Sequence, residues 1–206
     1  MSYTPRMRRS LATVLLIVLL AAGAGATTLV PLSFEQLVNA SQSVVYGRVS
    51  DVRAQWTADR RFIESVVTIE ILRGIKGPST SLRAGSSGES IEFTVPGGQV
   101  GRYLNVIPGG PSFVRGDTAV FFLTAQGPRL PVTTGFTQGI YRVRRDAASG
   151  EMLVEPPVLE AGKVIRGDPR RKPVPLATFE NTVRAVATAL RQAQGRPEQG
   201  RGTGAR

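Results

Sequence analysis

The chain has 206 residues and contains neither cysteine nor histidine. Its length predicts a single core, since domains usually have about 100–200 residues. The two missing residue types exclude disulfides, a thiol nucleophile and Ser-His-Asp catalysis, and they remove the commonest metal ligands. We therefore predict no catalytic residue, no metal site and no cofactor, and we expect that the protein is not an enzyme.

The net charge of +11 is unevenly distributed along the chain. Residues 1–26 hold 3 basic and no acidic groups, residues 27–162 hold 13 and 12, and residues 163–206 hold 10 and 3, so the net charges are +3, +1 and +7. Because the body of the protein is nearly neutral, it carries no specific nucleic-acid signature. Any polyanion binding would belong to the C-terminal part.

The N-terminus has the pattern of a signal peptide. Three arginines precede an apolar run at residues 11–22, and residues 24–26 read Ala-Gly-Ala, which fits a signal peptidase site. A run of about 12 apolar residues is shorter than the roughly 20 that span a membrane. We predict that residues 1–26 are removed, that the mature chain starts at Thr27 without a transmembrane helix, and that it is exported to the periplasm or the extracellular space. Retention of the segment as an anchor stays open.

A short helix opens the predicted domain at residues 27–155. Ser33 and Gln36 have the spacing of a capping box, and Phe34, Leu37 and Val38 can share one face of the helix that follows.

Five or six strands are then predicted from β-branched and partly alternating segments, at residues 43–52, 61–72, 91–95, 118–124, 140–144 and 151–154. The most apolar strand, 118–124, should be central, and the last two should form a hairpin. Gly47 predicts a bend in the first strand, and the second strand should carry a bulge or be buried on both faces. The pattern favours a mainly β fold, a small antiparallel OB-like barrel with a short N-terminal helix and a C-terminal amphipathic helix.

A glycine-rich segment at residues 96–116 raises the question of a phosphate-binding loop. Pro96-Gly97-Gly98 and the second Pro-Gly-Gly run at 108–110 lack the phosphate lysine, and the segment leads into a strand rather than a helix. Proline followed by glycine is typical of type II turns, so we interpret the segment as a structural loop.

Several apolar residues nevertheless make this loop a possible partner-binding rim. The loop either packs over the barrel or is offered to a partner. Trp56, between the first two strands, is interpreted as a cap on the core in preference to a sugar platform. The candidate rim residues are Trp56, Tyr103, Leu104, Ile107 and Phe113.

Charged motifs elsewhere are interpreted as solvated surface. The carboxylates of Glu70 with Glu92, and of Asp59 with Glu64, could serve a glycosidase only if they converged in a pocket. Arg-Gly-Asp occurs at 115–117 and 166–168. We interpret both triplets as a turn-forming glycine between surface charges.

Beyond residue 155 the chain no longer has the pattern of strands. Residues 156–177 form a predicted proline-rich connector, and Thr178 is expected to cap a helix over 178–192. This helix has one apolar stripe: Phe179, Val183, Val186, Ala187 and Leu190. We expect the stripe to dock on the barrel, with use by a partner or a membrane surface as the alternative. Residues 193–206 should form a disordered basic tail.

Several stretches together resemble a group of exported, uncharacterised bacterial domains, namely Phe34-Glu-Gln-Leu-Val38, Val44-Val-Tyr-Gly-Arg-Val49, Thr68-Ile-Glu-Ile-Leu-Arg-Gly-Ile-Lys-Gly77 and Pro111-Ser-Phe-Val-Arg-Gly-Asp117. The pattern is also similar to the netrin-like, OB-type barrel of the tissue inhibitors of metalloproteinases. The resemblance covers about residues 32–145. It implies the barrel topology alone, because the zinc-binding cysteine of those inhibitors has no counterpart in this chain.

These features favour an exported non-catalytic module that binds a protein or another envelope component. A polyanion or envelope-surface binder acting through the basic tail, and a carboxylate-based hydrolase, are the alternatives. The sequence predicts neither the ligand nor the oligomeric state.

Overall fold

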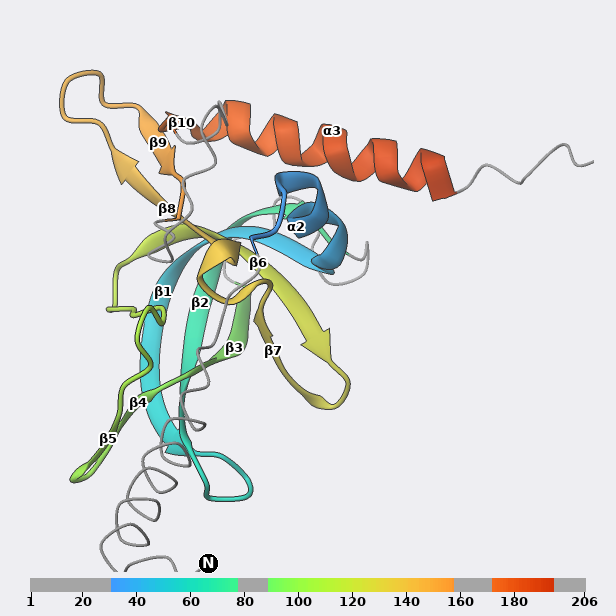
Figure 1. Ribbon diagram of the computed structural model, residues 1–206. Coiled ribbons are helices and arrows are strands. Elements are labelled where there is room, and N and C mark those ends of the chain that lie inside the picture. Colours follow the sequence, from blue (N-terminus) through green and yellow to red (C-terminus); the bar gives the residue numbers. More distant parts are fainter. Residues whose placement is uncertain (1–30, 78–88, 158–171, 195–206) are drawn as a thin grey trace, which may run out of the picture. The chain divides into compact units, whose positions relative to one another are not determined.

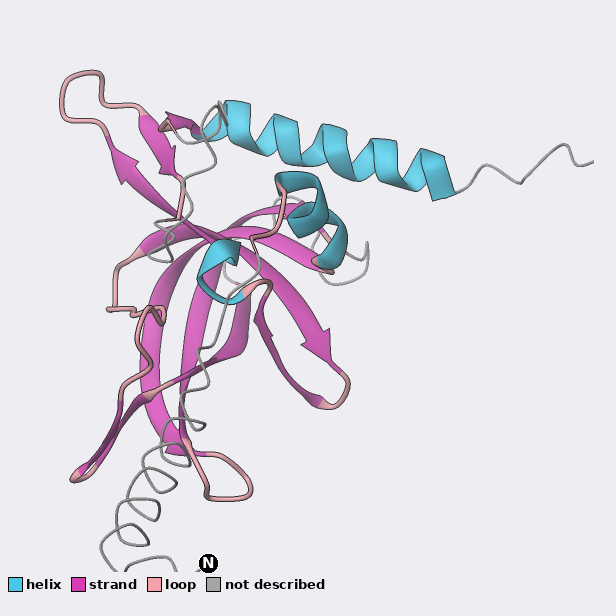
Figure 2. Ribbon diagram, viewed as in Figure 1, coloured by secondary structure: helices cyan, strands magenta, loops and turns pink. Residues whose placement is uncertain are grey.

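The computed structural model describes residues 31–77, 89–157 and 172–194, and these residues form a mainly β fold (Figures 1 and 2). An eight-stranded sheet has the order β1-β2-β3-β7-β6-β8-β9-β10, and β4 and β5 form a separate two-stranded sheet. The predicted signal peptide at 1–26 lies outside the described residues, as do most of the connector and the tail beyond residue 194. The elements are α2 (Phe34–Ala40), β1 (Ser43–Trp56), β2 (Ile63–Lys76), β3 (Ser90–Pro96), β4 (Gly98–Val100), β5 (Tyr103–Asn105), β6 (Thr118–Gln126), β7 (Arg129–Thr133), a 3-10 turn (Phe136–Gly139), β8 (Ile140–Arg145), β9 (Met152–Glu155), β10 (Val174–Pro175) and α3 (Leu176–Gln194).

Helix α2 begins with the predicted capping box. The Gln36 amide donates to the Ser33 hydroxyl at 3.2 Å, and the Ser33 amide donates to the Gln36 side chain at 2.8 Å. These two bonds satisfy amide groups that have no partner within the helix. The predicted inner face is buried, with Phe34, Leu37 and Val38 in the core.

The strand pairings of the sheet run in a ring through β1, β2, β3, β7, β6 and back to β1. All contacts in this ring are antiparallel ladders except the link between β3 and β7, which is a single parallel pair of Thr94 with Val132. The mainly β prediction is confirmed, but no continuous ladder closes the barrel at this link. Strand β6 is central, as predicted, since it pairs with β1, β7 and β8.

Strand β1 bends where the sequence predicts it. The register between β1 and β2 shifts between Tyr46 and Gly47. A Cβ atom at Gly47 would lie 2.9 Å from the backbone oxygen of Glu70, so only glycine allows the strands to approach this closely. In β2 the adjacent residues Val66 and Val67 are both fully buried, as two-sided burial requires.

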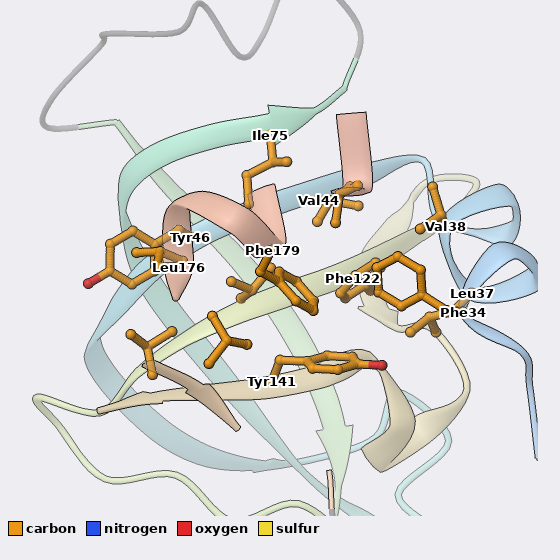
Figure 3. Packing of buried hydrophobic residues seen from close by; sticks show 14 of the residues in the cluster. Phe34, Leu37, Val38, Val44, Tyr46, Ile75, Phe122, Tyr141, Leu176 and Phe179 are labelled. Atoms are coloured by element: carbon orange, nitrogen blue, oxygen red, sulfur yellow. The ribbon is translucent and has the colours of Figure 1, made fainter. Parts of the chain in front are cut away.

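Two hydrophobic clusters lie on opposite faces of the sheet, because Phe121 and Phe122 are neighbours in β6 and belong to different clusters. The larger cluster joins the sheet to both helices (Figure 3). In it, the ring of Phe179 lies 4.9 Å from Tyr141 and 5.5 Å from Phe34. The predicted docking of the C-terminal stripe on the barrel is thereby confirmed.

Several element boundaries differ from the sequence prediction. Helix α3 begins at Leu176, so Thr178 is not its cap but lies within the helix, where its carbonyl accepts a bond from the Thr182 hydroxyl. The end of the predicted connector forms β10, which pairs with β9. Strand β7 and the β4–β5 hairpin were not predicted. None of the described helices is long and apolar enough to cross a membrane.

Candidate binding rim

Exposed apolar side chains occur on the adjoining ends of the β1–β2 and β4–β5 hairpins. Strand β4 lies against β1 and β2, and Figure 1 shows β4 and β5 beside the far ends of these strands. Leu104 is 65% exposed and Phe62 60% exposed. We call this surface the rim and define it by five residues: Trp56, Phe62, Tyr103, Leu104 and Val106.

Hydrogen bonds hold the β4–β5 hairpin to β2. The Gly97 amide donates to the Ile63 carbonyl at 2.9 Å, and the Ser65 hydroxyl donates to the Gly97 carbonyl at 2.8 Å. The Asn105 side chain donates to the same Ile63 carbonyl at 3.3 Å. The rim therefore stands on a clamped hairpin rather than on a free loop.

The centre of the rim is an aromatic pair. The rings of Trp56 and Tyr103 lie 5.5 Å apart at 66°, an edge-to-face arrangement. The guanidinium of Arg102 lies 5.2 Å from the centre of the Tyr103 ring and donates to its hydroxyl at 3.1 Å. Trp56 is 37% exposed and belongs to neither core cluster, so it does not cap the core as expected. The reason is that β1 extends to Trp56, four residues beyond the predicted end of the strand.

Two of the predicted rim residues lie deeper. Phe113 is half-buried and packs at 5.8 Å from Phe93 and 5.9 Å from Phe121, so it extends the core. Ile107 is also half-buried, and its carbonyl accepts a bond from the Gly110 amide. The structure thus brings together Trp56 and Tyr103 from the predicted set and leaves Leu104 exposed on the same hairpin as Tyr103.

Phe62 and Val106 complete the rim; Val106 lies in the loop that the sequence predicts as a possible partner-binding rim, whereas Phe62 was missed by sequence reasoning. Phe62 stands at the start of the predicted strand 61–72, where an apolar residue reads as part of a buried face. In the structure it belongs to the turn before β2, and its backbone bonds to Thr57. Because the predicted strand began at residue 61, Phe62 was assigned to the strand and its exposure was not predicted.

Only the second Pro-Gly-Gly run forms the expected turn, since the Gly110 amide donates to the Ile107 carbonyl at 2.9 Å and Gly109 has a φ of 69°, as type II turns require. Gly97 also has a positive φ, 100°, but it joins strands β3 and β4, and its amide donates to Ile63 of β2, so the first run is not a turn. The residue after Asp117 begins strand β6, so the segment does not lead into a helix N-terminus. Asp117 in the first Arg-Gly-Asp triplet accepts bonds from Arg142 at 2.7 Å and from the Val114 amide at 3.0 Å. The second triplet lies outside the described residues.

The proposed carboxylate pairs are occupied by other partners. Glu70 is bound to Arg48 at 3.1 Å and Glu92 to Arg53 at 2.7 Å. The hydrogen bond from Arg53 lowers the pKa of Glu92, which keeps this carboxyl ionised. A general acid needs the opposite shift, so Glu92 is not suited to that role.

Acidic groups also do not converge on a metal site, since the described part of the chain holds no group of three or more potential metal ligands. No protein-family model matches the chain, and a comparison with curated proteins gives no significant match.

Proposed function

We propose that the protein is an exported, non-catalytic binding module that engages a protein partner through the rim. The observation that carries this proposal is the exposed aromatic pair of Trp56 on β1 with Tyr103 on the β4–β5 hairpin, a hairpin that is hydrogen-bonded to β2. Tryptophan, tyrosine and arginine are the residue types most enriched among binding hot spots. A clamped hairpin also loses little conformational entropy when it binds.

Export is the part of the proposal that depends on sequence alone. The arginines before the apolar run, together with the Ala-Gly-Ala site at 24–26, support secretion. The ring of pairings through β1, β2, β3, β7 and β6 supports the proposed resemblance to OB-type barrels, which are five-stranded and partly open.

Site-specific photocrosslinking tests the rim. A photoreactive amino acid replaces Leu104 in the full chain, and the producing cells are irradiated before extraction of the envelope. The matched control carries the same group at Val114, which is 66% exposed, as Leu104 is 65% exposed, but lies outside the rim. We expect one defined protein adduct from position 104 and none from position 114. Equal adducts at both positions, or no adduct at either, would contradict the proposal.

A second candidate function, binding of a polyanion, is favoured by a hollow between α2 and α3. The hollow has a volume of about 490 Å³ and contains two cations, Lys76 and Arg191, with no carboxylate among its lining residues: Asn39, Ser41, Gln42, Lys76, Ala187, Leu190 and Arg191. The net charge of +7 over residues 163–206 would add to this field.

The test of this candidate must leave α3 in place, because α3 belongs to the core. The chain is therefore shortened after residue 194, and Arg191→Gln is made separately. Binding to heparin that depends steeply on salt and falls in both variants would favour the polyanion function. Heparin binding that is unchanged in both variants would exclude it.

A further inference from the structure

Several arginines on the sheet and in its loops are paired with carboxylates of the protein itself. Arg48 binds Glu70 at 3.1 Å, and Arg53 contacts both carboxylate oxygens of Glu92, at 2.7 and 3.1 Å. The same holds for three more pairs: Arg115 with Asp51, Arg142 with Asp117, and Arg144 with Glu155. The positive charge of these arginines is thus compensated within the fold.

The arginines close to the rim residues in the sequence form no such ion pairs among the residues that the structure describes. Arg60, Arg61 and Arg102 are exposed, and none of them forms an ion pair within the described part of the chain. Arg102 contacts the Tyr103 ring and hydroxyl instead. Arg129, at the start of β7, lies close enough to Asp59 to contribute to the lowering of its pKa, so it adds a fourth cation to this end of the sheet.

Acidic groups near the rim do not compensate these charges. The carboxylate of Asp59 accepts hydrogen bonds from the Thr57 hydroxyl and the Arg61 amide, which fix the turn. The carboxylate of Glu64 accepts a bond from the Gln55 side chain. Four arginines against two carboxylates leave this end with a net charge of +2. In the adjoining sheet, by contrast, Arg48, Arg53 and Arg142 are paired with carboxylates.

The geometry of the aromatic pair argues against a nucleic acid or a glycan as the partner. Such ligands stack on flat, accessible aromatic faces. Here Trp56 presents an edge-to-face contact to Tyr103 at 66°, and Arg102 covers the Tyr103 ring. The remaining rim residues include the aliphatic side chains Leu104 and Val106, which suit burial against apolar groups of a protein.

We infer that the partner of the rim is a protein segment that combines acidic residues with apolar ones. Its apolar side chains would cover Trp56, Tyr103 and Leu104, and its carboxylates would pair with Arg60, Arg61 and Arg102. This inference depends on the proposed function of the rim and names the chemistry of its partner. Such charge pairs mainly raise the association rate and select the partner, whereas the apolar centre supplies most of the affinity.

The test combines the photoreactive group at position 104 with neutral substitutions of the arginines. In the full chain, Arg60→Gln, Arg61→Gln and Arg102→Gln are made together. A matched control carries Arg48→Gln, Arg115→Gln and Arg144→Gln, which remove three paired arginines outside the rim. We expect the adduct to weaken by about tenfold in the rim variant and to persist in the control. The crosslinked peptide, identified by mass spectrometry, should contain Asp or Glu beside apolar residues.

A defined probe gives an independent readout. Trp56 is the only tryptophan of the chain, so its fluorescence reports on the rim directly. Polyglutamate should shift the emission of the unsubstituted protein at low salt, and it should not shift that of the rim variant. An oligothymidylate that binds in place of polyglutamate would overturn the inference in favour of nucleic acid. An adduct that is equally strong in the rim variant would overturn the acidic partner while leaving the binding function intact, whereas the absence of any adduct contradicts the binding function itself.

Discussion

Arg73 on β2 and Glu180 on α3 form a bridge between the sheet and the C-terminal helix. One guanidinium nitrogen of Arg73 lies 2.8 and 2.9 Å from the two carboxylate oxygens of Glu180. The Glu180 side chain is only 3% exposed, and Arg184 adds a second contact at 3.3 Å. A buried carboxylate requires such compensation, because burial of an unpaired charge is costly. The pair therefore fixes where α3 lies on the sheet.

Removal of one partner should destabilise the fold. In Arg73→Ala, Glu180 keeps only its longer contact with Arg184, so we expect the free energy of unfolding to fall by about 2 kcal/mol. Urea unfolding monitored by circular dichroism measures this change. The matched control is Arg144→Ala, which breaks an ion pair whose arginine is 72% exposed and should cost less than about 1 kcal/mol.

A double variant distinguishes pairing from simple loss of packing. In Arg73→Met with Glu180→Leu, both charges disappear and apolar volume remains, so stability should return close to that of the unsubstituted protein. If the double variant were as unstable as Arg73→Ala, compensation of the Glu180 charge would not be the cause.

Acid should weaken the fold through its surface carboxylates. The hydrogen bond from Arg53 lowers the pKa of Glu92 below its ordinary value of 4.5, and the hydrogen bond from Arg115 lowers the pKa of Asp51 below 3.8. A carboxyl with a lowered folded pKa stabilises the fold above its unfolded pKa, and this contribution is lost as the pH falls through the folded value. We therefore expect the urea midpoint to decrease as the pH is lowered from about 5 to 2.

Glu92→Gln should flatten this acid dependence, because the amide does not titrate. Glu151→Gln is the control, since the Glu151 side chain makes no ion pair within the described residues. An identical pH profile for Glu92→Gln and the unsubstituted protein would disprove the assigned contribution of the Arg53–Glu92 pair.

The sequence predicts the elements whose causes are local. The capping box of Ser33 with Gln36, the apolar strand over 118–124 and the bend at Gly47 are found where the pattern places them. Strand β7 was missed because its Leu-Pro-Val sequence contains a proline, which usually argues against a strand. It forms an antiparallel ladder with β6, in which Leu123 and Thr124 lie opposite Thr133 and Val132.

The rim could be predicted only in part, because the contacts among its residues depend on tertiary structure and not on local sequence. Trp56, Tyr103 and Leu104 stand out as apolar residues in segments expected to be loops. The contact of Trp56 with Tyr103 depends on the pairing of Gly98 with Asn105, which builds the β4–β5 hairpin. Phe113 lies in the same loop but turns toward Phe93, and this distinction is tertiary.

The proposed export can be tested at the N-terminus of the chain. If residues 1–26 are a signal peptide, the exported protein should begin at Thr27, because residues 24–26 supply the small residues that signal peptidase requires. Intact-mass measurement of the secreted or periplasmic protein checks this. Ala24→Phe with Ala26→Phe should block cleavage and leave the longer precursor, while Gly23→Ala should be processed normally. A mature protein that retains Met1 would instead indicate an anchor.

Gly98 lies where the β4–β5 hairpin packs against β1 and β2. It has a φ of 138°, and an added Cβ would lie 2.7 Å from the Ser65 hydroxyl and 3.0 Å from the Ala54 side chain. Gly98→Ala should therefore push the β4–β5 hairpin away from β1 and β2, at a cost of about 2 kcal/mol. Because the hairpin carries Tyr103, the edge contact with Trp56 should be lost.

Gly101 provides the control within the same hairpin. It also has a positive φ, 57°, but an added Cβ would meet nothing within 4 Å. Gly101→Ala should therefore cost only the backbone strain, about 1 kcal/mol, and leave the emission of Trp56 unchanged. Gly98→Ala should shift the same emission to longer wavelength and abolish the adduct from position 104. If both variants kept the adduct, binding would not depend on the clamped position of the hairpin, since only Gly98 lies against β1 and β2.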